Sequence, residues 1–414
     1  MAYDSPGVYV EEVPSGSAPI AGVGTSTAGF IGRIVSTSSG STIPPAATSP
    51  SSAVPVQAGV GIVSTSSGST TRAATSATST TSDRAEVGEV KLCTNFTEFK
   101  KFFGDFSSDV NQSNLAHAVY GFFSNGGTRC YVVQVDEIAT ALEKFEAIDE
   151  IAIVAAPGIT DKNFLQNICE HCKTMGDRFA ILDSSEEINL GSLSYEDAKK
   201  NLPDNSDYAA LYFPWIQVVD PATKAPKYVP PSGHMAGVYA RVDTQRGVHK
   251  APANEVVFGA TGLKYSISKS KQDGLNPKGI NCIRNLNGNI RVWGARTLGG
   301  EDNKEFTYIN IRRLFNYLRE SIDEGTQWTV FEPNSPELWA RISRNLTAFL
   351  TTVWRRGALF GNAPEQAFFV KCDEETNPPE LRDLGQVVTI IGVAVVKPAE
   401  FVIFRISQWK DSGK

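Results

Sequence analysis

The short motif CEHC at residues 169–172 contains the side chains best suited, by type, to metal or redox chemistry. Thiolates and imidazoles are common zinc ligands, and a C-x-x-C pair that opens a helix is typical of redox cysteines. This pair instead falls late in a helical pattern, and no second cysteine pair could complete a four-ligand zinc site. We therefore expect Cys169 and Cys172 to be buried thiols, and we expect no metal and no cofactor.

The other patterns that catalysis would need are also missing from the sequence. The turn AAPGIT at 155–160 lacks G-x-G-x-x-G and the lysine of a P-loop. There is no G-x-S-x-G, and the serines between 36 and 82 have no histidine nearby to activate them. Three histidines, His117, His234 and His249, have no carboxylate or cysteine at a spacing typical of a ligand set. The sequence predicts no catalytic residues.

Length and composition bound the class of protein. The 414 residues are 41% hydrophobic and 20% charged, as in a globular protein of two or three domains. The net charge of -6 argues against general nucleic-acid binding. No apolar run approaches the ~18–20 residues that span a bilayer, so direct membrane insertion is not expected. Without a signal-peptide pattern, and with six scattered cysteines, the sequence favours synthesis in the cytoplasm.

The first large unit, expected over residues 20–260, has the pattern of an α/β domain. Strand, helix and strand patterns follow one another between 150 and 183, which predicts a βαβ unit with parallel strands. A Ser/Thr-rich insertion at 35–86 interrupts this unit and repeats IVSTSSGST at 34–42 and 62–70. Two interpretations stay open for it: a flexible or surface-exposed excursion, or a pair of related β-hairpins.

The second unit, expected over residues 261–398, reads as helices packed on a sheet. Apolar stripes predict helices over 308–325 and 336–356, and the second begins with Ser335 as N-cap before Pro336. Strand-like runs follow, including VVTIIGVAVV at 387–396. The fold class is thus mixed α/β.

The predicted helix at 336–356 carries arginines opposite its apolar stripe. Arg341, Arg344 and Arg355 share that face, and no acidic residue occurs between Leu338 and Pro364. Solvated faces usually mix charges of both signs. We therefore weigh an acidic partner surface against a face that is solvated or paired within the chain.

The two ends of the chain both carry strand-like segments with no obvious partner beside them. FVIFRI at 401–406 is apolar on both faces, which is unusual for a chain terminus. Unpaired edges recruit other chains, and strands added head to tail build a helical polymer unless the ring closes. The residues that we expect to pair with other copies are Val8, Tyr9, Val10, Phe401, Val402, Ile403, Phe404 and Ile406.

Several blocks of the sequence, in order, resemble the contractile tail sheath proteins of myophages and of contractile injection systems. Besides PGVYVEE near the start and FFSNGGTRCYVVQV at 122–135, the blocks are LNPKGINCIRNLNGNIRVWGARTL (275–298), YINIRRLFNYLRESIDEGTQWTVFEPN (308–334), LWARISRNLTAFLTTVWRRGALFG (338–361), AFFVKCDEETNPPE (367–380) and PAEFVIFRISQW. The Ser/Thr-rich stretch departs from this pattern.

The resemblance implies a structural protein that forms stacked hexameric rings around an inner tube protein, with baseplate and terminator or cap proteins at the ends. It implies an N-terminal arm at 1–19, a C-terminal arm at 399–414, an inner domain completed by neighbours' strands and an outer α/β domain. On triggering, the sheath shortens and drives the tube through a target envelope without consuming a nucleotide. The protein would be made in the bacterial cytoplasm and built into a tail or injection particle. The arginine face would meet the tube.

Two other classes remain to be distinguished. One is an α/β nucleotide-binding enzyme with a C-terminal oligomerisation domain. The other is a non-contractile filament or adhesin that relies on the Ser/Thr-rich insertion.

Overall fold

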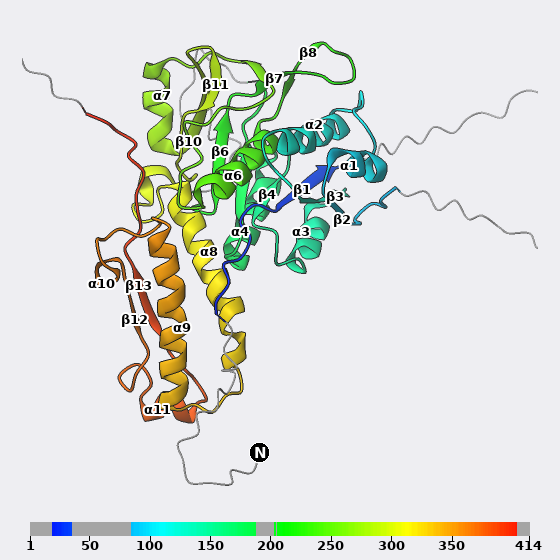
Figure 1. Cartoon of the computed structure of the whole chain (residues 1–414). Coiled ribbons are helices and arrows are strands. Elements are labelled where there is room, and N and C mark those ends of the chain that lie inside the picture. The colour runs from blue at the N-terminus through cyan, green and yellow to red at the C-terminus, as the bar shows by residue number, and fades with distance from the viewer. Residues whose placement is uncertain (1–18, 35–83, 188–202, 204, 404–414) are drawn as a thin grey trace, which may run out of the picture. The chain divides into compact units, whose positions relative to one another are not determined.

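The computed structural model describes residues 19–34, 84–187, 203 and 205–403. Its largest element is an eight-stranded sheet of order β11-β10-β6-β5-β4-β1-β3-β2 (Figure 1). The six strands from β10 to β3 run parallel, and β11 and β2 close the two edges antiparallel. The strands are β1 (Ala28–Arg33), β2 (Lys91–Cys93), β3 (Cys130–Val135), β4 (Ile153–Ala155), β5 (Phe179–Asp183), β6 (Ala209–Phe213), β10 (Ile280–Leu286) and β11 (Asn289–Val292).

Helices cover both faces of this sheet. Phe30 points into a core with α1, α2 and α6, whereas its neighbour Ile31 points into a core with α3 and α4. Central strands of a parallel sheet are apolar on both faces for this reason. The covering helices are α1 (Phe96–Phe103), α2 (Val110–Ser124), α3 (Ile138–Glu146), α4 (Lys162–Met175) and α6 (Ser232–Arg246).

The βαβ unit predicted between 150 and 183 is confirmed as β4, α4 and β5, with the two strands parallel. Asp161 caps the helix by accepting from the Phe164 amide at 2.9 Å, and Gly176 ends it in a left-handed conformation. A small sheet of order β8-β7-β9 and helix α7 complete the α/β body. Their bounds are β7 (Ile216–Val219), β8 (Pro226–Val229), β9 (Ala260–Leu263) and α7 (Lys269–Leu275).

The α/β sheet does not stop at the boundary expected between residues 260 and 261. Strand β10 pairs in parallel with β6, with Ile280 opposite Leu211, and β11 forms a hairpin with β10. This pairing buries Ile280 and Cys282 in the α/β core. Local sequence patterns could not reveal it because the two partner strands lie about seventy residues apart, with several other strands and helices between them.

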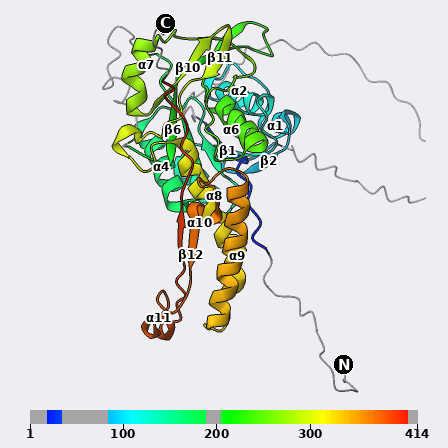
Figure 2. The same ribbon diagram turned by 60° about the vertical axis from the view of Figure 1, so that its left-hand side comes forward.

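The remaining elements follow α8 (Ile309–Thr326). They are α9 (Pro336–Arg355), α10 (Pro364–Ala367), β12 (Phe368–Lys371), α11 (Pro379–Asp383) and β13 (Ile390–Val393) (Figure 2). Ser335 caps α9 by accepting from the Leu338 amide at 3.4 Å, as predicted. The predicted apolar stripe of α9 is buried, and it packs with Phe368 of β12 and with Val370 and Ile391.

Helix α8 belongs to both halves of this body. Arg313 donates to both carboxylate oxygens of Asp243 on α6, at 2.9 and 2.6 Å. Thr25 joins the pair, because its hydroxyl donates to Asp243 at 2.7 Å and its carbonyl accepts from Arg313 at 2.9 Å. Further along α8, Leu314 and Leu318 pack with α9. The helix therefore ties the α/β body to the C-terminal elements through a buried ion pair.

The first described residues run along α8 (Figure 1). The Val23 amide donates to the Ser321 hydroxyl at 3.1 Å. Gly325 has no room for a side chain, because the atoms of Ile20 occupy that space. The segment that leads to the N-terminus is therefore held on the same helix that carries Arg313.

Replacing Arg313 with Met should destabilise the protein by about 3–5 kcal/mol, because it leaves the Asp243 carboxylate buried without its cation. Both side chains are only 3% exposed. The double variant R313M/D243L should recover much of the loss, since a buried pair can be replaced by apolar residues. Urea unfolding of the full chain measures both variants. A control, R341M, removes a more exposed ion pair and should cost less than ~1 kcal/mol; an equally small loss in R313M would contradict the assignment.

Candidate assembly surfaces

The two-stranded sheet of β12 and β13 has an incomplete backbone pattern. The strands pair antiparallel, with Phe368 opposite Val393 and Lys371 opposite Ile390. Within the described residues, no further strand joins this sheet. Backbone N–H and C=O groups along an open edge can accept another strand, and an isolated two-stranded sheet is only marginally stable.

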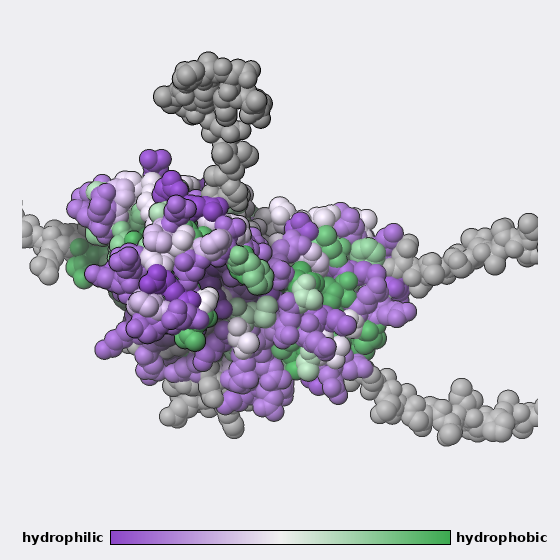
Figure 3. All heavy atoms as spheres, turned by 90° about the horizontal axis from the view of Figure 1, so that it is seen from below, coloured by the Kyte–Doolittle hydropathy of each residue, from purple (hydrophilic) through white to green (hydrophobic). Residues whose placement is uncertain are grey.

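One face of this small sheet packs on α9 and the other is open. Phe369 lies on the open face, 56% exposed, with its ring over Gly392 on the opposite strand. Seen from below, the surface is mainly hydrophilic with hydrophobic residues in scattered groups (Figure 3). Large exposed apolar side chains on the C-terminal elements and the loops that join them are Val330, Phe331, Phe360, Phe369, Leu384, Val387 and Ile390. Such exposure on an otherwise well-packed body is typical of an interaction surface.

The predicted terminal strands are only partly visible. Val8, Tyr9, Val10, Phe404 and Ile406 lie outside the described residues. The start of the C-terminal segment is described: Phe401, Val402 and Ile403 are 70%, 67% and 79% exposed and belong to no strand of their own chain. Their pairing with another copy stays a prediction.

The three predicted arginines lie on α9 but differ in their contacts. Arg341 pairs with Glu332 at 3.3 Å and lies 4.5 Å from the centre of the Trp328 ring, so it is engaged within its own chain. Arg344 and Arg355 are exposed on α9 and make no ion pair with any residue that the structure describes. Arg341 is thus paired within the chain, and whether Arg344 and Arg355 meet a partner or only solvent stays a prediction.

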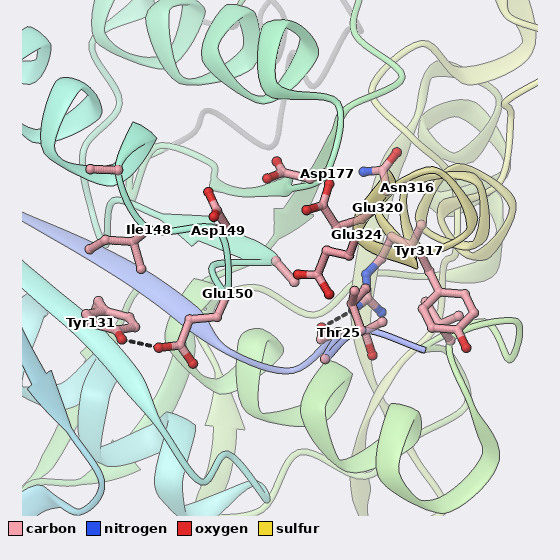
Figure 4. Close-up of a pocket in the computed structure, with 16 residues that line it drawn as sticks. Thr25, Tyr131, Ile148, Asp149, Glu150, Asp177, Asn316, Tyr317, Glu320 and Glu324 are labelled. Carbon is pink, nitrogen blue, oxygen red and sulfur yellow. Dashed lines mark hydrogen bonds between the residues drawn. The ribbon is translucent and has the colours of Figure 1, made fainter. Parts of the chain in front are cut away.

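An acidic cavity lies where the N-terminal segment, the α3–β4 loop and α8 meet. Its volume is about 510 Å³. The acidic residues that line it are Asp149, Glu150, Asp177, Glu320 and Glu324. Figure 4 shows Asp149, Asp177, Glu320 and Glu324 gathered around one space, while Glu150 accepts a hydrogen bond from Tyr131.

The acids of this cavity act on one another. Partial burial raises the pKa of Glu320, and the nearby charges of Asp177, Asp323, Glu324 and Asp149 raise it further. Repulsion of this kind disfavours the charged form. Even so, no group of three or more His, Cys, Asp or Glu side chains in the described ranges is arranged to hold a metal ion.

The carboxyl end of the main sheet is closed by a buried carboxylate. Asp183 accepts from the Gly158 and Ser232 amides at 3.0 and 2.8 Å and from the Ser232 hydroxyl at 2.6 Å. Burial raises the pKa of Asp183 to about 6. Nucleotides bind at this end of α/β sheets. Here a carboxylate takes the amide of the AAPGIT turn that a phosphate would need.

Cys169 and Cys172 of the CEHC motif are buried in α4, as predicted, and so is His171, whereas Glu170 is exposed. Burial raises the pKa of Cys169 to about 12 and that of Cys172 well above its ordinary value. Burial also lowers the pKa of His171 to about 4. Protonated, enclosed thiols are poor nucleophiles and poor metal ligands.

Family models account for most of the described chain. The model of the phage tail sheath protein central domain matches residues 132–298, and that of the phage tail sheath C-terminal domain matches 301–408. The chain belongs to the contractile tail sheath family. It is a structural sheath subunit and not an enzyme. The two matched regions meet shortly after β11, an edge strand of the eight-stranded sheet.

Relatives and solved structures of sheaths agree over large parts of the chain. A putative prophage major tail sheath protein of Pseudomonas aeruginosa is 25% identical over 304 residues, 71% of this chain and 74% of that protein. The contracted sheath of an extracellular contractile injection system, PVC, matches with a TM-score of 0.73 and 27% identity, covering 99% and 98% of the two chains. A chain from the contracted baseplate structure of the anti-feeding prophage matches with a TM-score of 0.74, 27% identity and 98% and 99% coverage.

Sequence reasoning missed two parts of this sheath subunit. The acidic cavity could have been suspected from Glu320, Asp323 and Glu324, which share one helical face by spacing. The hydrogen-bond partners of Glu400, just before FVIFRI, gave no local signal, because they lie about 90 to 125 residues earlier. In the part of the chain that the structure describes, no helix combines the length and the hydropathy needed to cross a bilayer.

Replacing Glu320 with Gln should raise the thermal unfolding midpoint at neutral pH, because it removes a carboxylate whose charged form the fold disfavours. A raised carboxyl pKa means that the folded state binds the extra proton, so its stability falls as pH rises through that pKa. The advantage of E320Q should therefore shrink as pH falls toward about 4. Glu143→Gln, exposed on α3, serves as control; equal midpoints for E320Q and wild type at neutral pH would contradict the repulsion.

Proposed function

We propose that this sheath subunit polymerises by exchanging its chain ends with other copies. Segments around Val8–Val10 and Phe401–Ile406 of neighbouring subunits pair with the open edges of β12 and β13. The observation that carries the proposal is the incomplete two-stranded sheet, together with three exposed apolar residues, Phe401–Ile403, that join no strand of their own chain.

Strand addition fits the chemistry of these segments. Each added strand supplies backbone hydrogen bonds, and alternate side chains can pack on α9 and on the open face near Phe369. A subunit that gives one strand at each end links neighbours on two sides. Such heterologous contacts continue into a helical array when the rotation does not close.

We further propose stacked hexameric rings around an inner tube protein, with a baseplate at one end and a terminator or cap at the other. The elements from about residue 300 onward, with the two arms, form the inner assembly layer, and the α/β body lies outside. Similarity over 98% or more of the chain to the contracted PVC sheath and to the contracted helical sheath of the anti-feeding prophage favours an injection system over a phage tail. The protein is made in the bacterial cytoplasm and is then built into that particle.

The stroke requires no nucleotide in this proposal. The extended sheath is kinetically trapped, and contraction releases free energy through new contacts between subunits. The arms keep neighbours connected while each body moves as a unit. Contacts with the tube must then be weak enough to break, as exposed ion pairs of ~0.2–1 kcal/mol are.

Arg344 and Arg355 are the proposed tube contact. They are exposed on α9, whereas Arg341 is held by Glu332 and Trp328. A tube surface rich in carboxylates would suit two guanidinium groups on one helix face. This narrows the predicted contact from three residues to two.

Deleting residues 401–414 should yield folded subunits that do not polymerise, because the donated strand is gone while β12 and β13 keep their own pairing. Size-exclusion chromatography with light scattering, circular dichroism and negative-stain imaging measure this. A shorter deletion of 410–414 keeps FVIFRI and should still form tubes. Polymerisation without 401–414, or a misfolded aggregate, would show that this strand is not exchanged.

Replacing Arg344 and Arg355 together with Glu should reduce the number of tube-filled extended particles at least severalfold, because both charges facing an acidic tube are reversed. Sheath without tube should form instead. Co-purification of sheath and tube followed by negative-stain imaging gives the count. Lys173→Glu, exposed on α4, is the matched charge reversal; tube-filled particles at wild-type levels in R344E/R355E would rule out this contact.

A further inference from the structure

The last polar residue before the C-terminal strand segment is enclosed by hydrogen-bond donors. One carboxylate oxygen of Glu400 accepts from the Asn276 amide at 2.6 Å and from Arg296 Nε at 3.0 Å. The other accepts from a terminal nitrogen of Arg296 at 2.9 Å and from the Tyr308 hydroxyl at 2.8 Å. We call Asn276, Arg296 and Tyr308 the Glu400 cradle.

Glu400 and Arg296 are largely shielded from solvent, so the interaction between their charges is only weakly screened. The Arg296 side chain is 5% exposed and that of Glu400 is 17% exposed. Burial by itself would raise the pKa of Glu400, but hydrogen bonds from Arg296, Asn276 and Tyr308 outweigh it and lower the pKa. Bidentate arginine–carboxylate pairs with further donors are among the strongest side-chain contacts in proteins.

The cradle is anchored in the α/β body. Asn281 on β10 donates to the Arg296 carbonyl at 2.7 Å and accepts from the Arg296 amide at 2.8 Å. The same Asn281 donates to the Leu211 carbonyl on β6 at 3.2 Å. Tyr308 directly precedes α8, and its backbone bridges to that of Arg296. A load on Glu400 therefore passes into the sheet and into α8.

Glu400 lies where the chain leaves the C-terminal elements for the α/β body. The backbone is held up to Val396, whose amide donates to the Ala358 carbonyl at 3.3 Å. The chain then passes beside the α/β body to the end of α7 (Figures 1 and 2), where Asn276 meets Glu400. The next three residues, Phe401–Ile403, are exposed.

We infer that Glu400 is a positioning residue that roots the C-terminal arm on the α/β body, so that the free tether to a neighbouring copy begins at Phe401. The inference rests on the proposed strand exchange and adds where the arm is fixed. All four residues stand in blocks that carry the resemblance to sheath proteins: Asn276 and Arg296 in 275–298, Tyr308 in 308–334, and Glu400 in PAEFVIFRISQW.

Rooting at Glu400 has a mechanical consequence. If the contact were lost, the tether would begin after Val396 and gain residues 397–400. Four extended residues add about 13–14 Å of slack. Without that slack, a displacement of one subunit is passed to the neighbour that holds its arm, and the spacing between subunits is narrowly defined.

The test compares E400Q with Glu143→Gln and wild type as full chains. Glutamine lacks the charge and one acceptor oxygen, so Arg296 keeps a weaker partner. On unassembled subunits separated by size exclusion, we follow the Val396 amide, which donates to the Ala358 carbonyl, and the Glu400 amide, which donates to the Pro398 carbonyl. Their hydrogen exchange should be at least about tenfold faster in E400Q, as expected when a charge-assisted contact is lost. On assembled sheaths, electron-microscopy diffraction should show broadened layer lines in E400Q, while Glu143→Gln matches wild type.

A second variant guards against misfolding. Y308F removes a single donor and should give a smaller change in exchange and in sheath order than E400Q. Unchanged exchange in both variants, or fast exchange together with fully ordered sheaths, would overturn the inference. If strand exchange itself does not occur, the variant that lacks residues 401–414 should still polymerise. If that variant stays monomeric but E400Q forms fully ordered sheaths, only the proposed role of Glu400 is wrong.

Discussion

One sheet of this subunit has open edges, where no strand among the described residues pairs with the backbone. Strands β12 and β13 form a sheet of two, and each retains an edge that no described strand fills. Backbone N–H and C=O groups are obligatory hydrogen-bonding groups, so an open edge either meets water or recruits another chain. If neighbouring copies exchange strands as we propose, the connections between them can persist while the folded bodies move.

Connections between subunits that persist during movement require a folded body that does not unfold under load. Helix α8 provides it, because the buried pair of Arg313 and Asp243 fixes α8 to α6, and Thr25 fixes the N-terminal segment to both. The Glu400 cradle fixes the opposite end of the chain to the same body. Thr25 and Glu400, near the points where the two proposed arms begin, are thus both fixed to one packed unit. A force that enters through either arm would then act on the core instead of on a loop.

The subunit carries both enclosed ion pairs and partly exposed charged groups. Buried ion pairs and hydrogen bonds hold Thr25 and Glu400 in place. By contrast, Arg344, Arg355 and Glu320 are at least partly exposed. Exposed charges contribute little each and are screened by salt, so contacts through them can form and break in large numbers. The nucleotide-free stroke that we propose needs that distinction between permanent and exchangeable contacts.

Local patterns in the sequence determined much of the fold. Ser335, Pro336 and the apolar stripe from Leu338 to Val353 specify α9, and the βαβ unit around α4 follows from hydrophobic periodicity and capping. Cys169 and Cys172 share helical spacing with Leu165 and Ile168, and all four lie on the buried face of α4. Each of these properties depends on neighbours within a few residues, which a sequence displays directly.

The tertiary structure alone decided which distant residues meet. Strand β10 joined the main sheet by pairing with β6, so this sheet includes residues on both sides of the boundary expected between 260 and 261. Arg341 proved to be paired with Glu332, whereas Arg344 and Arg355 stayed free of ion pairs in the described ranges. Glu400 found its partners at Asn276, Arg296 and Tyr308. Such contacts are set by how packed elements bring remote chain segments together, and local spacing carries no record of that.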